Sequence, residues 1–292
     1  MRPSGRKSNL ENNRPDRMAA QGPGNRPGRH PNARGRSLAG LLLAVALGLL
    51  VAFLPAFRLQ TYEITPTRGM TPAAIEAAVP IRPGDHLFQG LGPGLDQWLG
   101  LRYGRTEELL IQKFPYIRTV RAYLDFPSQM QINIEERVEV AYVSIPDGCV
   151  LLDKEGYALL ILPEPPAGIP VIEGVSVRAL NLGQPLTVQV PDSMNSAVSL
   201  LGAIIDADKD TRTPQKLLSQ VRQIRPLSNG RLFLTLVLPG TGDELTVAAE
   251  NSMDQLDDML WLRFAMDQGA LDNRGKGVLD LTGTRRIFIP DA

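Results

Sequence analysis

A run of twenty residues without charge, at positions 38–57, constrains this chain more than any other feature of its sequence. A helix rises 1.5 Å per residue, so a run of this length reaches about 30 Å, the thickness of the hydrocarbon core of a bilayer. The glycines and the proline within it are tolerated in membrane helices. A cleaved signal peptide has a shorter apolar region and small residues at its cleavage site. We therefore predict an uncleaved transmembrane helix.

Charge is distributed unevenly on the two sides of this run. Residues 1–37 hold nine basic and two acidic side chains, whereas the whole chain holds 31 of each. The basic excess precedes the run, which predicts a cytoplasmic N-terminus and an extracytoplasmic remainder. Residues 1–37 are rich in Gly, Pro, Asn and Arg, so we expect a disordered tail near anionic lipid heads. Arginine among glycine and proline also occurs in nucleic-acid-binding segments, but we expect no nucleic acid here.

Residues 58–136 predict one small domain in the order strand, helix, helix, strand, strand. The expected strands lie at 58–64, 117–126 and 129–137, and the expected helices lie at 73–79 and 107–114. Thr71 and Thr106 stand at the positions that favour a helix N-cap. The last two strands are joined by Pro127-Ser128 and predict a hairpin. Residues 89–104 are rich in glycine and predict a loop or short turns. Trp98 in this loop is either a contact residue or, as we expect, packs the loop onto the domain.

Residues 137–292 predict a second domain of strands and helices. The expected elements are strands at 138–143, 149–152, 157–160 and 169–174, a helix at 192–205, strands at 218–225, 231–238 and 244–249, a helix capped by Asn251 or Ser252, and strands at 277–281 and 285–289. In the last helix, apolar spacing predicts a buried stripe made of Met253, Leu256, Met259, Leu260 and Phe264. Asp257 and Asp258 fall on its predicted solvent face.

The first of these domains resembles the POTRA (polypeptide-transport-associated) domain, a β-α-α-β-β module. The segments that carry the resemblance are ITPTRG at 64–69, PGDHLF at 83–88, FPYIRTVR at 114–121 and INIEER at 132–137. Their order and spacing match the module, although the loop at 89–104 is longer than the family usually shows. The resemblance implies a POTRA fold for residues 58–136.

The soluble part as a whole resembles the FtsQ/DivIB family of bacterial cell-division proteins. The motifs are ERVEVAYV at 136–143, LLDKEG at 151–156, IPVIEG at 169–174 and VLDL at 278–281. Glu139 stands where the family usually has proline, and Thr282 and Gly283 stand where an arginine and an aromatic residue usually follow. The resemblance covers residues 38–290. It implies an α+β protein with a tail at 1–37, a transmembrane helix at 38–57, a POTRA domain at 58–136 and a mixed strand and helix β domain at 137–292.

The resemblance also implies a function by binding. FtsQ/DivIB proteins bind single-pass coiled-coil proteins of the FtsB/DivIC and FtsL types at the division septum, and the complex helps to recruit and regulate the septal peptidoglycan synthase complex. The far C-terminal strands make that contact. An edge strand suits it because its unpaired N–H and C=O groups can add a partner strand. The partner-binding residues expected here are Leu279, Asp280, Leu281, Arg285, Arg286, Ile287, Phe288 and Ile289.

Signatures of catalysis do not stand out in the sequence. His30 lies in the tail and His86 in a predicted loop, and we find no Ser-His-Asp set, G-x-S-x-G elbow or phosphate-binding glycine loop. Glu135 and Glu136 are neighbours on a strand and point to opposite faces. Cys149 is the single cysteine, so no internal disulfide or thiolate metal cluster forms, and its apolar flanks predict burial. We expect no enzyme activity, no cofactor and no metal.

Two alternative functions stay open at this point. A membrane-anchored POTRA protein for export or outer-membrane assembly would carry several POTRA repeats. An anchored enzyme or sensor would carry a site of a kind not recognised above. Capture of partners, or a shift of the melting temperature with a ligand, separates these from a division protein.

Overall fold

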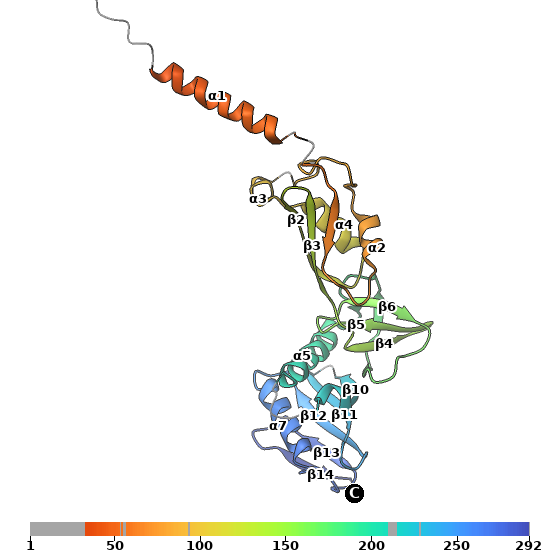
Figure 1. Cartoon of the computed structure of the whole chain (residues 1–292). Coiled ribbons are helices and arrows are strands. Elements are labelled where there is room, and N and C mark those ends of the chain that lie inside the picture. Colours follow the sequence, from red (N-terminus) through yellow and green to blue (C-terminus); the bar gives the residue numbers. More distant parts are fainter. Residues whose placement is uncertain are drawn as a thin grey trace, which may run out of the picture. The chain divides into compact units, whose positions relative to one another are not determined.

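The computed structural model describes residues 33–52, 54, 57–92, 94–209, 215–227 and 229–291 of the chain. The chain forms two compact units, Met1–Phe53 and Leu54–Ala292. The first unit contains the helix α1 (Ala33–Ala52), and the second contains every other helix and strand (Figure 1). Residues 1–32, which are most of the predicted disordered tail, lie outside the described residues.

The helix α1 covers part of the predicted membrane span. It begins at Ala33, so residues 33–37 of the predicted tail are helical instead. Its side chains are exposed from Leu38 to Leu50. Phe53, Pro55 and Ala56, which belong to the predicted span, lie outside the described residues. Within the described ranges, no helix meets the length and hydropathy required to cross a membrane.

Residues 57–136, called the first module below, form a three-stranded sheet packed against helices. The elements are β1 (Thr61–Ile64), α2 (Pro72–Ala78), α3 (Leu95–Leu99), α4 (Gly104–Lys113), β2 (Ile117–Asp125) and β3 (Gln129–Glu136). The strand order is β1-β3-β2, with β1 parallel and β2 antiparallel to β3. The predicted order of strands and helices is confirmed, with the short helix α3 added inside the predicted loop. The core of this module includes Ile75, Leu87, Leu110, Ala122 and Ile132.

The helix starts of this module agree only in part with the predicted caps. Thr71 caps α2, because its hydroxyl accepts a hydrogen bond from the amide of Ala74 at 3.3 Å. The predicted cap at Thr106 is wrong, since α4 begins at Gly104 and Thr106 is buried. The helix starts early because Tyr103, just before it, is fixed in the core by a 2.6 Å hydrogen bond to the carbonyl of Leu87.

Residues 137–291, called the second module below, are built on a sheet of nine strands. Its elements are β4 (Ala141–Ile145), β5 (Gly148–Leu152), β6 (Ala158–Leu162), β7 (Val171–Ile172), β8 (Val177–Ala179), β9 (Thr187–Val188), α5 (Pro191–Ala207), α6 (Leu217–Gln220), β10 (Val221–Pro226), β11 (Arg231–Val237), β12 (Glu244–Glu250), α7 (Gln255–Asp267), β13 (Gly277–Asp280) and β14 (Ile287–Pro290). The strand order is β14-β13-β12-β11-β10-β7-β4-β5-β6, while β8 and β9 form a separate pair. The edges of the large sheet are therefore β14 and β6.

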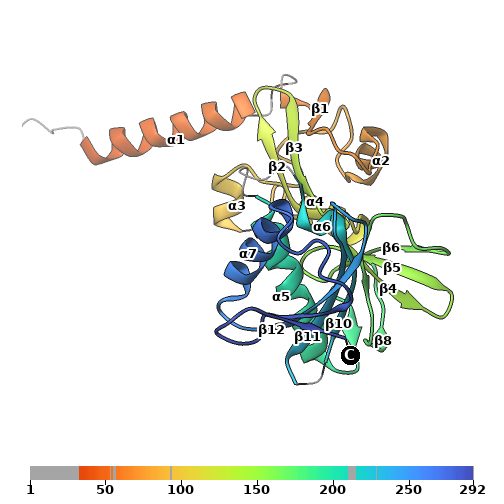
Figure 2. The same cartoon turned by 90° about the horizontal axis from the view of Figure 1, so that it is seen from below.

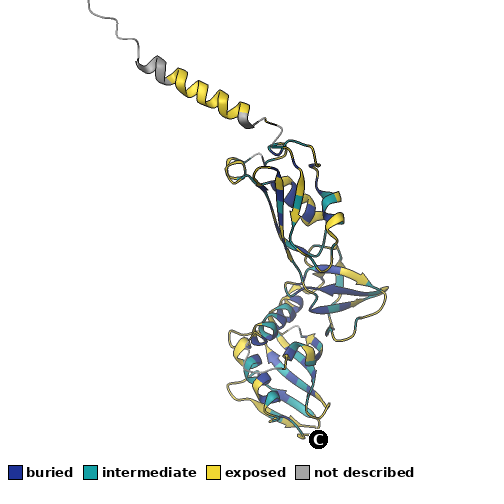
Figure 3. Ribbon diagram, in the orientation of Figure 1, coloured by how far each residue is buried: buried dark blue, intermediate teal, exposed yellow. Residues whose placement is uncertain are grey.

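The helices α5 and α7 pack against each other beside β10, β11 and β12 (Figure 2). Buried apolar residues of the sheet and of both helices form one core, which includes Leu200, Ile204, Leu234, Met259 and Leu262. Figure 3 shows this pattern as buried positions that recur along the strands and along one side of each helix. Cys149 is buried as predicted.

The predicted stripe of α7 is wrong in its phase. Three of its five members, Met253, Leu256 and Phe264, are exposed, whereas Met259 is buried as predicted and Leu260 is half-buried. The buried residues of α7 are Gln255, Met259, Leu262, Arg263, Ala265 and Met266. The shift follows from Arg263, whose guanidinium donates at 2.6 Å to the carbonyl of Ala207 at the end of α5. Burial of this cation suits a helix C-terminus, where carbonyl groups lack partners within the helix. The adjacent Phe264 therefore points outward.

The residue that follows β3, Arg137, has a buried side chain that contacts residues of the second module. The guanidinium of Arg137 donates to Asp153 at 2.5 Å and to Glu155 at 3.1 Å, and it stacks 3.6 Å from the ring centre of Tyr157. Nearby, the hydroxyl of Tyr116 donates to Glu139 at 2.7 Å. Glu139 therefore has a partner of its own at the position where the family usually has proline.

Candidate functional site

The strand β14 forms one edge of the nine-stranded sheet. It pairs with β13 on one side, and no strand of the described chain pairs with its other side. Ile287 and Ile289 are 53% and 52% exposed, whereas Phe288 between them packs against the core. This alternation is that of a strand with one buried face. We call the outer side of this strand, with Ile287 and Ile289, the β14 edge.

The direction of the backbone groups on β14 follows from one hydrogen bond. The amide of Asp291 donates at 3.0 Å to the carbonyl of Lys276, the residue before β13. Because backbone groups alternate along a strand, those of Ile289 and Ile287 also point to β13, and those of Phe288 and Pro290 point outward. Pro290 has no N–H group, so the outward groups are the N–H of Phe288 and the carbonyls of Phe288 and Pro290. This short, open ladder can add one partner strand.

The turn before β14 is stabilised by Asp280. Its carboxylate accepts from the amide of Thr282 at 2.8 Å and from the hydroxyl of Thr282 at 2.7 Å. These two hydrogen bonds lower the pKa of Asp280 below its ordinary value. An aspartate that bonds the backbone two residues on is a common turn former. Thr282, which departs from the family pattern, therefore holds the turn.

The structure divides the eight predicted partner-binding residues into three groups, which are buried, exposed and half-buried. Leu279 and Leu281 are buried, at 2% and 3% exposure, and belong to the core. Their side chains therefore support β14 from behind and are not part of the exposed surface. Arg285, Arg286, Ile287 and Ile289 are exposed, and Asp280 and Phe288 are half-buried.

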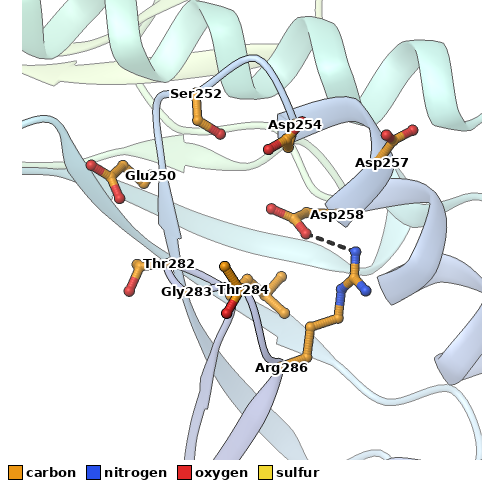
Figure 4. A pocket seen from close by; sticks show the side chains of 10 residues that line it. Glu250, Ser252, Asp254, Asp257, Asp258, Thr282, Gly283, Thr284 and Arg286 are labelled. Carbon is orange, nitrogen blue, oxygen red and sulfur yellow. Dashed lines mark hydrogen bonds and ion pairs between the residues drawn. The ribbon is translucent and has the colours of Figure 1, made fainter.

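A pocket of about 310 Å³ lies between the start of α7 and the turn before β14 (Figure 4). Its charged lining consists of one guanidinium and four carboxylates, those of Arg286, Glu250, Asp254, Asp257 and Asp258. The net charge of this lining is negative, which favours a cationic group. Among the described residues, no set of three or more His, Cys, Asp or Glu side chains is arranged to hold a metal ion.

Arg286 and Asp258 connect the pocket to the β14 edge. The guanidinium of Arg286 donates to Asp258 at 3.0 Å and lies 5.0 Å from the ring centre of Trp261 (Figure 4 shows the ion pair). Burial raises the pKa of Asp258 above its ordinary value, and the hydrogen bond from Arg286 opposes this only in part. The expectation that Asp258 lies on the solvent face of α7 is therefore wrong, although Asp257 is exposed as expected.

Sequence reasoning missed the part of the site that comes from α7. Asp258 lies one turn before the buried Leu262 and one turn after Gln255, so it belongs at the margin of the buried stripe. That signal was available only with the correct phase of the helix. The pairing of Asp258 with Arg286, 28 residues away, depends on the tertiary fold and has no local signature.

Comparison with known proteins finds no family model that matches the chain, but it finds curated relatives. The cell division protein FtsQ of Chloroflexus aurantiacus is 27% identical over 182 residues, which are 58% of this chain and 62% of that protein. FtsQ of Mycolicibacterium smegmatis is 30% identical over 127 residues, which are 42% of this chain and 34% of that protein. FtsQ of Mycobacteroides abscessus is 28% identical over 136 residues, or 46% and 39% of the two chains.

In each of these three alignments the chain spans less than two thirds of the relative's length. Among solved structures, the major extracytoplasmic domain of the division protein DivIB from Geobacillus stearothermophilus is 20% identical. It covers 49% of this chain and 99% of that one, with a TM-score of 0.27. The curated relatives confirm the resemblance found in the sequence.

Proposed function

The chain is a relative of the FtsQ/DivIB cell-division proteins, and from this premise we propose that it is a non-enzymatic scaffold of the division machinery. In this proposal it binds single-pass coiled-coil proteins of the FtsB/DivIC and FtsL types outside the membrane. The complex then helps to recruit and regulate septal peptidoglycan synthesis.

The open β14 edge is the observation that carries this proposal. Natural proteins usually protect an exposed edge, because its free N–H and C=O groups invite another strand. Here the edge displays two half-exposed isoleucines beside an acidic pocket. A partner strand that pairs at Phe288 covers Ile287 and Ile289, and a Lys or Arg side chain next to that strand fits the charge of the pocket.

The proposal includes a membrane anchor at residues 38–57, with residues 1–37 in the cytoplasm and both modules outside. Its support is the uncharged run itself and the basic residues that precede it. In this arrangement the POTRA-like first module stands next to the bilayer and the second module presents the β14 edge to partners that are anchored in the same membrane.

The test compares the two edges of the nine-stranded sheet in the full-length protein. The double variant Ile287→Lys/Ile289→Lys places charge on the β14 edge, where charge discourages strand addition. The matched control is Leu160→Lys/Ile161→Lys on β6, the opposite edge, where both residues are also exposed. Each variant is captured from cross-linked membranes of dividing cells, and its partners are identified by mass spectrometry.

We expect small coiled-coil membrane proteins with the wild type and with the β6 control, and their loss with the β14 variant. Loss with the β6 variant alone contradicts the assignment to β14. Recovery of transport components, or of no division protein with any form, contradicts the proposed function. Point variants are preferable to a truncation after Gly277, because such a truncation also removes Leu279 and Leu281 from the core.

A further inference from the structure

The helix α3 exposes its apolar side chains instead of burying them. Leu95, Trp98 and Leu99 are 82%, 55% and 76% exposed, so the prediction that Trp98 packs onto the domain is wrong. With 3.6 residues per turn, these three residues share one face of the helix. Gln97 lies on the opposite face. A face with two leucines and a tryptophan in water is costly unless another surface covers it.

The fold holds α3 with this face outward. A Cβ atom at Gly92 would lie 1.6 Å from the side-chain amide of Gln97, and one at Gly104 would lie 2.5 Å from it. Glycine at both positions therefore makes room for Gln97 to face the domain. The amide of Arg102 donates to the carbonyl of Gln97 at 2.8 Å, and the guanidinium of Arg102 pairs with Glu107 on α4 at 2.6 Å. The outward face of α3 is thus a built feature of the module.

This face lies at the end of the first module where the chain enters it. The segment after α3 runs along β2, where the amide of Leu124 donates to the carbonyl of Leu101 at 2.9 Å. The β2–β3 turn follows at once and carries Phe126, which is 52% exposed. The ring of Phe126 lies 5.9 Å from that of Phe57, one of the first described residues of the second unit. Figure 1 shows α3 and this turn at the same end of the module.

The length of chain limits how far this end can lie from a membrane. Between Ala52, the last residue of α1, and Phe57 there are five Cα–Cα steps, which reach about 18 Å when fully extended. If α1 lies in the bilayer with Ala52 at its surface, Phe57 lies within that distance of the surface, and Phe126, whose ring contacts that of Phe57, lies beside it. The apolar face of α3 is then close to lipid.

We propose that α3 is a membrane-interface foot, in which Leu95, Trp98 and Leu99, with Phe126, insert into the headgroup region of the bilayer. This inference rests on the membrane anchor of the proposed function. Tryptophan is enriched at this depth because its ring is apolar and its N–H finds a polar partner. Arg58, next to Phe57 in the chain, and Arg105, on the first turn of α4, are exposed and suit lipid phosphates, whereas Asp96 lies beside the apolar face of α3.

The foot supplies a second contact with the membrane, so it limits rotation of the first module about the chain that connects it to α1. A single covalent connection does not by itself fix the orientation of an attached domain. Two contacts with the bilayer orient the module.

The test uses the intrinsic fluorescence of Trp98 in the full-length protein in vesicles. The chain has two tryptophans, so Trp261→Phe leaves Trp98 as the only one, and Trp98→Phe leaves Trp261 as the matched control. Both forms are reconstituted in vesicles of phosphatidylcholine and phosphatidylglycerol, with and without bromine on the acyl chains. Iodide in the buffer reports exposure to water.

We expect brominated lipid to quench Trp98 and not Trp261, and iodide to quench Trp98 only weakly. The further change Leu95→Ser/Leu99→Ser alters exposed residues only, and it should shift Trp98 emission to longer wavelength and reduce quenching by lipid. Strong quenching of Trp98 by iodide without quenching by lipid contradicts the insertion of α3 into the bilayer but leaves the proposed membrane anchor untouched. Release of the protein from the vesicles by alkaline carbonate overturns the anchor and the foot together.

Discussion

At the scale of single residues, the ion pairs of this protein differ in how deeply their side chains are buried. Arg137 and Asp153 are both buried, with side chains 8% and 3% exposed. Asp153 also accepts from the amides of Glu155 and Tyr157 at 2.9 and 2.8 Å. A buried ion pair adds little by itself, but removal of one partner leaves the other charge unpaired. Arg137 is therefore expected to be sensitive to substitution.

We predict that Arg137→Met lowers the free energy of unfolding by about 3 kcal/mol, because Asp153 loses its cation while its two amide bonds remain. Urea denaturation followed by circular dichroism measures the change. The control is Arg118→Met, which removes exposed ion pairs with Glu135 and Glu155 and should have little effect. Equal losses in both variants would show that the burial of Arg137 does not matter.

Two aspartates beside the candidate site should respond to pH in opposite directions. The pKa of Asp258 is raised by burial, so its contribution to stability is present below its ordinary pKa of 3.8 and is lost as pH rises through the folded value. Asp258→Asn mimics the protonated form. We predict that it keeps or raises stability at pH 7, relative to wild type, and that this difference shrinks toward pH 3.5. Thermal melts across this range measure it.

Asp280 provides the opposite case. Its pKa is lowered by Thr282, so its contribution to stability is present above 3.8 and is lost as pH falls through the folded value. We predict that Asp280→Asn destabilises the protein at pH 7 and that the difference from wild type vanishes in acid. The same thermal melts give the result. A loss of stability that does not change with pH would assign the effect of Asp280 to turn geometry instead of charge.

Residue roles were predictable where they depend on neighbours in the chain. The cap at Thr71 needs only Pro72 after it and a helical segment beyond. The failure at Thr106 has a tertiary cause, because Tyr103 is anchored to Leu87 and α4 starts at Gly104, three residues before the predicted helix. The ion pair between Arg286 and Asp258 is tertiary too, so the candidate pocket had no signal in either segment alone.

At the scale of elements, α7 shows how a hydrophobic pattern misleads when a buried position is polar. We predict that Met259→Ala costs about 3 kcal/mol of stability because Met259 is fully buried. Phe264→Ser should change stability by less than about 0.5 kcal/mol, since Phe264 is 58% exposed. Chemical denaturation of both variants decides between the two phases of the helix. Met259 is buried in both phases, so a loss at Phe264 as large as that at Met259 would restore the stripe expected from sequence.

The strands that alternate regularly were predictable, whereas the separate pair β8–β9 was not. The β2–β3 hairpin follows from its period and its turn, and β11 and β12 lie close to their expected limits. The pair β8–β9 is too short to show a period. The first residues of the strand expected at 218–225 form α6, because the carboxylate of Asp208 accepts the amides of Leu217 and Leu218.

At the scale of the whole molecule, residues 57–291 contain two separate hydrophobic cores. One includes residues from Leu59 to Ile134, and the other includes residues from Val140 to Leu281. Each core has its own sheet, and Arg137, which lies between the two cores in sequence, pairs with Asp153 of the second module. Regions with separate cores commonly open as separate cooperative units. A defect in one core should therefore leave the other intact.

We predict that Leu110→Ala, a fully buried change on α4, increases amide hydrogen exchange across residues 57–136 and leaves the strands β10 to β12 protected. The reciprocal variant Leu234→Ala should release β10 to β12 and spare β2 and β3. Both substitutions remove the same atoms from fully buried sites, so their local costs are comparable. If either variant raises exchange uniformly across both modules, the network around Arg137 couples the two cores into one unit. In that case the orientation set near the membrane would be carried rigidly to the β14 edge.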